Sequence, residues 1–405
     1  MTDIKSDKNT DIFDRNERVS LMEPMLIGST SRHHERFTDL ALTLTDRAAG
    51  FRRSLPESIR VALADLVRAM NCYYSNLIEG HDTHPIDIER ALKNDYSQDP
   101  QKRDLQLEAK AHIAVQSWID AGELANPTSA VGICEIHRRF TELLPDELRW
   151  VDTPDRASRE RVMPGELRKR DVKVGRHVPV RPSAVPNFLD RFESAYSGLG
   201  RANTIISAAA AHHRLLWIHP FVDGNGRVAR LMSHATLRDA LDTGGIWSIA
   251  RGLARNATEY KTLLSNCDLP RRNDTDGRGN LSEEALAEFT EFFLNICIDQ
   301  IKFMEQLMQP DRFRARVRMW AEEETRIGAL PSQATDVLEA MLFQGELPKS
   351  EVATRLGVTA RHAQRITGAL VERGVIRSAN LRAPWVLAFP AALASRWMPG
   401  LFPEA

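Results

Sequence analysis

The sequence predicts a mainly α-helical protein with one small β-hairpin and a C-terminal winged helix-turn-helix domain. Three observations support this fold class. Apolar residues recur at steps of three and four along most of residues 56–308, which is the period of an amphipathic helix. The stretch VKVGRHVPV, residues 172–180, alternates in character around a central Gly-Arg pair, as a short hairpin does. Residues 331–390 follow the order helix, helix, turn, helix, hairpin, which is typical of a winged helix.

Composition limits the class of protein. At 405 residues the chain is long enough for two or three domains. A net charge of -1 provides no global field that would attract a nucleic acid or a membrane. The polar N-terminus lacks a secretory signal and no apolar run reaches about 18 residues, so we expect a cytoplasmic protein without a membrane span. The cysteines are far apart, which predicts free thiols: Cys72, Cys134, Cys267 and Cys297.

Shifts in pattern divide the chain into five segments. The first residues are polar and predict a disordered tail. Helical patterning then continues to Pro310, and a different module begins near residue 331. The segments are the tail (1–20), an N-terminal helical region (21–125) that includes a long helix at about 56–80, a central core (126–310), a linker (311–330) and the winged-helix domain (331–405).

The individual helices follow from apolar spacing and start signals. The pattern from residue 56 to about residue 79 places Ile59, Leu63 and Met70 on one face. Further helical runs are predicted at about 105–122 and 129–144, and helices are expected to begin near residues 186, 203, 227, 257 and 282. Ser282, followed by two glutamates, is a good start for the last of these. The preceding segment is rich in Asp, Asn and Gly, which predicts a polar loop.

The stretch WIHPFVDGNGRVARLM, residues 217–232, gathers chemically useful residues. A helical run ends at Pro220 and the Asp-Gly-Asn-Gly sequence, and helix resumes at about Gly226. The loop is therefore expected at a helix N-terminus, where free N–H groups and the positive end of the dipole bind anions. Gly224 and Gly226 allow the backbone to approach a phosphate closely, and Asn225 could add an amide donor.

The remaining polar side chains of this stretch complete a candidate transfer site. Arg227 and Arg230 lie one turn apart, so both could clamp one polyphosphate with bidentate hydrogen bonds. Asp223 could hold a Mg²⁺ ion that bridges phosphate oxygens. His219 can accept a proton near neutral pH, so it could deprotonate an incoming hydroxyl. This set indicates nucleotidyl or phosphoryl transfer, and a glycine-rich surface turn beside an unrelated histidine is the alternative interpretation.

The pattern His-Pro-Phe-x-Asp-Gly-Asn-Gly-Arg-x-x-Arg in this stretch matches the Fic family signature without departure, and the resemblance extends over roughly residues 60–305. It implies a Fic-type helical core that transfers AMP from ATP to a Tyr, Thr or Ser hydroxyl of a target protein, including the enzyme itself. By position it implies that His219 is the base, that Asp223 binds Mg²⁺, that Gly224, Asn225, Gly226 and Arg227 contact phosphates, and that Arg230 grips the γ-phosphate. Phe221 would anchor the loop in the core.

The segment YYSNLIEG, at the end of the helix at about 56–80, contains a candidate switch. Ser75 and Glu79 are four residues apart, so they share a helix face, and Gly80 is expected to end the helix. From the residues alone, a solvated glutamate at a helix end is the simpler interpretation. The Ser-x-x-x-Glu-Gly pattern resembles the inhibitory motif of Fic proteins. That resemblance implies that Glu79 pairs with Arg230 and blocks the γ-phosphate position, which would make the enzyme autoinhibited.

Two further segments resemble functional parts of the family. The hairpin expected at 172–180 resembles the flap that pairs with a target segment by strand addition, and the preceding PGELR matches the family's lead-in. Its docking residues would be Val172, Lys173, Val174, Gly175, Arg176, His177 and Val178. The segment IARGLARNATEY resembles the part that lines the nucleoside, which implies contacts from Asn256 and Tyr260. An aromatic residue at helical spacing is, however, more often part of the core.

The C-terminal module suggests a second partner. Between residues 349 and 382 it carries seven Lys or Arg against two Glu. Arg361, Gln364 and Arg365 are expected on the outward face of the second helix of the helix-turn-helix, which suits contact with DNA phosphates and base edges. Dimerisation or target docking, with a charge that is simply solvated, is the alternative.

Three other activities stay open at the level of the sequence. The first is removal of AMP from a target, because in some Fic proteins the inhibitory glutamate positions a water molecule. The second is another nucleotide or phosphate donor, because the loop contacts phosphates rather than bases. The third is a nucleotide-sensing DNA-binding regulator, although such a sensor would not need His219. The expected partners are ATP with Mg²⁺, a target protein with an exposed hydroxyl, and DNA; the assembly is either a monomer or a homodimer.

Overall fold

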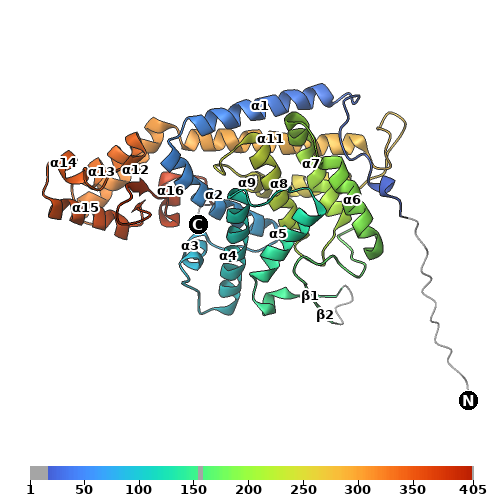
Figure 1. Cartoon of the computed structure of the whole chain (residues 1–405), viewed down its shortest axis with the longest axis horizontal. Helices are drawn as coiled ribbons and strands as arrows, with labels where there is room; N and C mark the ends of the chain where they lie inside the picture. Colours follow the sequence, from blue (N-terminus) through green and yellow to red (C-terminus); the bar gives the residue numbers. More distant parts are fainter. Residues whose placement is uncertain (1–16, 154–157, 404–405) are drawn as a thin grey trace, which may run out of the picture.

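The computed structural model describes residues 17–153 and 158–403, which form a mainly helical protein (Figure 1). Residues 1–16 of the predicted tail lie outside these ranges, and the tail's last two residues already belong to the 3-10 helix Val19–Met22. The core helices are α1 (His34–Arg53), α2 (Glu57–Ile78), α3 (Pro85–Leu92), α4 (Pro100–Asp120), α5 (Ala130–Glu142), α6 (Val185–Tyr196), α7 (Arg201–Ile218), α8 (Asn225–Leu241), α9 (Ile249–Arg255), α10 (Ala257–Asn266) and α11 (Glu283–Leu307). No helix in the described ranges has both the length and the apolar character that a membrane span requires.

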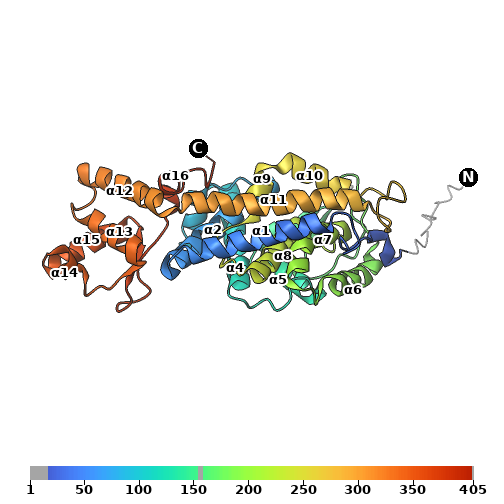
Figure 2. The ribbon, with the colours of Figure 1, turned by 90° about the horizontal axis from the view of Figure 1, so that it is seen from above.

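The pair α7 and α8 lies at the centre of the core, and the other helices pack around it. Helices α1, α6 and α11 contact α7, whereas α2, α4 and α5 contact α8. Helices α1 and α11 run side by side along one edge of the molecule (Figures 1 and 2). This arrangement places the loop between α7 and α8 within reach of the C-terminal end of α2.

Most helix boundaries coincide with signals in the sequence. The Ser282 hydroxyl accepts the N–H of Ala285 at the start of α11, and Gly80, at φ 89°, follows the end of α2. Two helices, α1 and α3, lie within the predicted helical region 21–125 but were not recognised as separate elements. The signal for α1 was present, because Phe37 and Phe51 are buried on its apolar face.

The hairpin predicted at residues 172–180 is reduced to a tight turn. Val174 and His177 form a single antiparallel bridge around Gly175, which has φ 60°. Pro179 has no N–H to donate, so a ladder cannot continue past the bridge on that side. The strand pair of the core lies earlier in the chain, where β1 (Trp150–Asp152) pairs with β2 (Arg159–Arg161) in antiparallel register.

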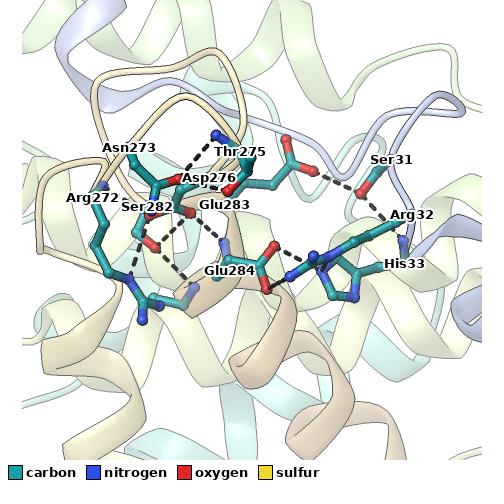
Figure 3. Close-up of polar contacts among 11 residues, drawn as sticks. Ser31, Arg32, His33, Arg272, Asn273, Thr275, Asp276, Ser282, Glu283 and Glu284 are labelled. Carbon is teal, nitrogen blue, oxygen red and sulfur yellow. Dashed lines mark hydrogen bonds and ion pairs between the residues drawn. The ribbon is translucent and has the colours of Figure 1, made fainter.

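The polar loop between α10 and α11 is folded against the chain that precedes α1 (Figure 3). Asp276 is buried and accepts hydrogen bonds from the Ser282 hydroxyl at 3.0 Å and from the Glu284 N–H at 2.9 Å. The Glu284 carboxylate pairs with Arg32 at 2.7 Å and lies 3.1 Å from His33. These contacts fix the start of α11 against the N-terminal segment.

The C-terminal module has the element order of a winged helix. The predicted linker 311–330 is mostly helix α12 (Pro310–Arg326), which packs on the module. The module contains α13 (Ala334–Gln344), β3 (Glu346–Leu347), α14 (Val352–Leu356), α15 (Ala360–Glu372), β4 (Ile376–Arg377), β5 (Trp385–Leu387) and α16 (Ala394–Trp397). Its strands form one antiparallel sheet in the order β3-β5-β4. Gly357, at φ 64°, turns the chain between α14 and α15.

The C-terminal module is held against the core through α2. Arg377 of β4 forms an ion pair with Asp65 of α2 at 2.5 Å. Farther along the same helix, the Tyr74 hydroxyl donates a hydrogen bond to the Leu401 carbonyl at 3.0 Å. Leu401 is fully buried in this contact. The end of the described chain therefore covers the second half of α2.

Candidate active site

The residues between α7 and α8 form a loop that is anchored in the core. Phe221 is fully buried, and its ring stacks on the His137 ring at a centroid distance of 3.9 Å. The Asn225 side chain accepts a hydrogen bond from the Phe221 N–H at 3.0 Å and donates one to the Phe221 carbonyl at 2.9 Å. The Asn225 side chain therefore braces the loop in this structure, and its predicted contact with a phosphate stays a prediction.

The backbone of this loop requires left-handed conformations. His219 ends α7 with φ 51°, and Gly224 precedes α8 with φ 80°. A Cβ atom on Gly226 would lie 2.4 Å from Oε1 of Glu79, so only glycine lets this carboxylate approach the first turn of α8. A carboxylate thus occupies the end of α8 at which the helix dipole and free N–H groups favour an anion.

Arg230 joins the first turns of α8 to the end of α2. Its Nε donates to the Ser75 hydroxyl at 2.8 Å, and its terminal nitrogen donates to Oε1 of Glu79 at 2.5 Å. The Arg230 side chain is 3% exposed and the Glu79 side chain 33%. Burial alone would raise the pKa of Glu79, but the charges of Arg230 and Arg227 outweigh burial and hold this pKa below its usual value. Glu79 is therefore an anion at neutral pH.

Arg227 is engaged on the opposite side, toward α4. It forms a buried ion pair with Glu108 and lies 3.2 Å from Nδ1 of His81. His81 in turn contacts Glu108 at 2.8 Å, and this contact raises the pKa of His81. One terminal nitrogen of this predicted second phosphate contact is thus engaged by protein groups, whereas its Nε is buried and has no hydrogen-bond partner among the described residues.

The two ring nitrogens of His219 lie in different surroundings. Its Nδ1 lies 3.3 Å from the Leu216 carbonyl, which favours the tautomer with a proton on Nδ1 and leaves the lone pair of Nε2 free. Burial lowers the pKa of His219 to about 4. The ring is therefore neutral near pH 7, as a general base must be.

Asp223 lies exposed on the same loop. Within the described ranges, no three His, Cys, Asp or Glu side chains gather in a metal-binding arrangement. A magnesium ion commonly uses one or two carboxylates together with phosphate oxygens and water. A single carboxylate beside an anion-binding helix end fits that pattern.

The turn at residues 172–178 lies beside the C-terminal end of α7. Nε2 of His177 is 2.7 Å from the Trp217 carbonyl, two residues before His219. Val174 and Val178 are exposed on this turn. The other residues predicted for target docking belong to the same turn: Val172, Lys173, Gly175 and Arg176.

The two residues predicted to line a nucleoside are used by the fold. Tyr260 is 2% exposed, and its hydroxyl lies 2.7 Å from Nε2 of His212. Burial raises the pKa of Tyr260 to about 12. The Asn256 amide donates to the Gly252 carbonyl at 2.9 Å. The Tyr260 ring packs beside Phe289 of α11, while its hydroxyl lies near Arg230 as well as His212. Its predicted contact with a nucleoside stays a prediction.

Three residues of the site were not predicted from the sequence: Glu108, His137 and Arg168. Glu108 lies on the buried face of α4, and a carboxylate at such a position signals a buried cation. His137 has an ordinary place in the apolar face of α5, so the sequence gives no signal for its stacking on Phe221. For Arg168 the sequence offers only its place at the end of the PGELR segment.

Comparison with known proteins matches the central part of the chain. Residues 127–237 match the sequence model of the Fic/DOC family. A relative named "Protein adenylyltransferase Fic" from Drosophila willistoni is 29% identical over 222 residues, which is 51% of this chain and 41% of the relative. Its counterpart in Drosophila erecta is 38% identical over 78 residues, 19% of this chain and 16% of that protein. The matches therefore span less than half the length of these curated relatives.

Structural comparison aligns the chain with solved structures of Fic proteins. A Fic family protein from Desulfovibrio desulfuricans G20 aligns with a TM-score of 0.49 and 15% identity, over 86% of this chain and 96% of that one. Residues 134–508 of Fic-1 from C. elegans align with a TM-score of 0.47 and 16% identity, over 68% of this chain and 73% of that one.

Proposed function

We propose that this chain, whose residues 127–237 form a domain of the Fic/DOC family, is an autoinhibited protein adenylyltransferase. It transfers AMP from ATP to a Tyr, Thr or Ser hydroxyl of a target protein, and also modifies itself. Curated relatives named protein adenylyltransferase support the reaction class. The neutral His219 and the anion-binding end of α8 support the same class on chemical grounds.

The described residues supply what this reaction needs. Nε2 of His219 accepts the proton of the target hydroxyl, whose oxygen bonds to the α-phosphorus of ATP while the bond to the β-phosphate oxygen breaks. Pyrophosphate leaves. Arg230 and the N-terminal end of α8 would hold the phosphates. A Mg²⁺ ion held by Asp223 would neutralise phosphate charge.

One observation carries the proposed autoinhibition: the Glu79 carboxylate lies against Gly226 and pairs with Arg230. A phosphate placed there would overlap the carboxylate and meet a like charge. The productive pose of ATP is therefore excluded while Glu79 keeps this position. Ser75 supports the same state, because its hydroxyl and its carbonyl both accept hydrogen bonds from Arg230.

Self-labelling of the purified full-length chain with ATP labelled at the α-phosphate tests the proposal. The Glu79→Gly variant should gain label sharply over wild type, and mass spectrometry should find AMP on a hydroxyl side chain. The double variant Glu79→Gly, His219→Ala should remain unlabelled. If Glu79→Gly gains no label, or if labelled γ-phosphate is incorporated instead, the proposal is wrong.

The alternative of AMP removal is tested with the product of that experiment. Wild-type protein added to labelled Glu79→Gly protein should leave the label in place if Glu79 only inhibits. Release of free AMP that depends on Glu79 would assign the reverse reaction to this site.

A second candidate function, DNA binding, is favoured by the outward face of α15. Arg361, Gln364 and Arg365 are exposed there, and in the described part of the chain neither arginine has an acidic partner. By contrast, Arg373 pairs with Glu324 at the end of the same helix. Full-length protein should bind duplex DNA with strong salt dependence, and the double variant Arg361→Ala, Arg365→Ala should lose this binding. Equal affinity of both proteins would exclude the surface.

A further inference from the structure

Arg168 occupies a central place between the catalytic loop and the turn at residues 172–178. It is 2% exposed. Its Nε donates to the carbonyl of His219 at 2.8 Å, and its own N–H donates to the carbonyl of Pro220 at 2.9 Å. The residue therefore holds two successive carbonyls of the loop that carries the proposed base.

The same guanidinium also holds both ends of the turn. One terminal nitrogen donates to the Arg170 carbonyl at 3.0 Å. The other donates to the Val180 carbonyl and lies 3.4 Å from the Ile218 carbonyl. Arg170 precedes the turn and Val180 follows it, so one side chain connects the two ends of the turn to the end of α7.

The Arg168 charge is unusual in its surroundings. Within residues 17–153 and 158–403 the side chain forms no ion pair, and its hydrogen bonds go to carbonyls alone. A buried cation without a direct ion pair is costly, and burial lowers the pKa of Arg168, although the charges of Asp171 and Glu17 act in the opposite direction. An apolar side chain at this position would remove the donors to the His219, Arg170 and Val180 carbonyls, so the arginine connects backbone segments that no apolar residue could connect.

The backbone that Arg168 holds is strained. His219 has φ 51°, a left-handed conformation that is unfavourable for a non-glycine residue and persists only where its surroundings enforce it. The hydrogen bonds to the His219 and Pro220 carbonyls provide such enforcement. The charge has a second effect, because after burial, which dominates, the Arg168 cation further lowers the pKa of His219.

We propose that Arg168 is a positioning residue for the transfer reaction: it locks the His219 backbone and both ends of the 172–178 turn into one unit, so that the base and the docked target segment are presented together. This inference rests on the proposed function. It extends that function, because the residue lies outside the loop signature and its side chain donates only to backbone carbonyls among the described residues.

The test uses the Glu79→Gly protein, in which the switch is open. Arg168→Gln removes the charge and most of the donors, whereas Arg168→Lys keeps the charge but cannot reach all the carbonyls. The control is Arg214→Gln, because Arg214 is also fully buried and also donates to a carbonyl, that of Pro24, but lies away from the loop. Self-labelling rates at saturating ATP, the KM for ATP and the pH profile are measured, with thermal unfolding in parallel.

Arg168→Gln should lower the maximal rate by about tenfold or more, as expected for a loss of positioning. The KM for ATP should change less than about twofold, because Arg168 does not contact the nucleotide. The acid limb of the pH profile should move only slightly above that of the Glu79→Gly parent, because burial, the main cause of the low pKa of His219, stays in place when the Arg168 charge is removed. Arg168→Lys should lower the maximal rate but leave the acid limb of the pH profile unchanged, because the charge is kept. Arg214→Gln should lower thermal stability and leave both the rate and the pH profile unchanged.

A rate and an acid limb of Arg168→Gln that match those of Arg214→Gln would overturn the proposal, as would an unchanged rate in Arg168→Lys. If Arg168→Gln does not fold, the Arg168→Lys rate decides alone. An inactive Glu79→Gly parent would instead contradict the proposed function, so the two failures are distinguishable.

Discussion

The end of α2 and the middle of α4 each present a glutamate to α8, but the two ion pairs are built differently. Glu79 follows the last turn of α2, is one-third exposed and meets Arg230. Glu108 lies within α4, is almost completely buried and meets Arg227. A carboxylate at a helix end can swing away at small cost, whereas one inside a packed helix cannot. Two arginines one turn apart on α8 therefore form ion pairs of different kinds: we expect the pair of Arg230 with Glu79 to open readily and the pair of Arg227 with Glu108 to stay closed.

The largest effect is expected at the pair of Arg227 with Glu108. Glu108→Gln leaves the buried Arg227 charge without its partner, which should lower the free energy of unfolding by about 3–5 kcal/mol. Denaturant unfolding followed by circular dichroism measures this loss. Glu305→Gln, which removes a partly exposed pair with Arg47, is the control and should cost far less. Equal losses in both variants would remove the distinction between the two contacts.

The pair of Arg230 with Glu79 should affect activity more than stability. Glu79→Gly removes a charge-assisted contact of about 1.5–3 kcal/mol, so self-labelling should rise roughly tenfold or more. Its free energy of unfolding should fall by much less than that of Glu108→Gln, because water reaches the Glu79 position. Glu108→Gln should show no gain of label. A comparable gain in both variants would mean that Arg227, rather than Arg230, controls the site.

Ser75→Ala should release the site only in part. It removes the hydroxyl that accepts from Arg230 but leaves the Glu79 pair intact. A hydrogen bond of about 1 kcal/mol corresponds to a gain in self-labelling of roughly fivefold. The self-labelling rate of Ser75→Ala, divided by that of Glu79→Gly, measures how much Ser75 contributes to the inhibition. A gain as large as that of Glu79→Gly would make Ser75, not Glu79, the main restraint.

The smallest change is expected from pH. The pKa of Glu79 is lowered, so its pair with Arg230 is fully present above the usual value of 4.5 and is lost only as the pH falls through the lowered pKa. The pKa of His219 is also lowered, to about 4, so its neutral form is complete at pH 6, where an ordinary histidine would be about a quarter neutral. Wild type should therefore stay inhibited from pH 8 to 5.

In the same range the Glu79→Gly rate should stay nearly flat from pH 8 to pH 6. Self-labelling in a buffer series of constant ionic strength measures both profiles. A fall to one-half near pH 6.5 in the Glu79→Gly protein would show that His219 has an ordinary pKa. Gain of label by wild type at pH 6 would show that the Glu79 contact is weaker than its geometry indicates.

Features set by local sequence were predictable, and features set by packing were not. Apolar spacing and caps located α2, α5 and α11, because these signals act within one helix. The Asp-Gly-Asn-Gly run located the loop before α8. The pair of Glu79 with Arg230 joins residues 151 positions apart, and only the family resemblance pointed to it.

Three other features depend on contacts that the sequence does not show. An asparagine in a loop can donate outward or brace the backbone, and nothing in the sequence distinguishes these states for Asn225. Tyr260 lies at a spacing that suits either a ligand contact or the core, and the sequence does not show that it is buried beside Phe289 with its hydroxyl near His212 and Arg230. Alternation in residues 172–180 suggested strands, but Pro179 limits the ladder to one bridge.

The hydrogen bond from Tyr74 to Leu401 ties the last part of the chain to the residue directly before Ser75. In a chimera with a different C-terminal module, the buried hydroxyl of Tyr74 would lose its acceptor, and the surface of α2 that Leu401 covers would be exposed to water. Substitutions in the C-terminal module where it contacts α2 therefore require matching substitutions in α2. In this protein the C-terminal module is packed as part of the helical core rather than as an interchangeable attachment.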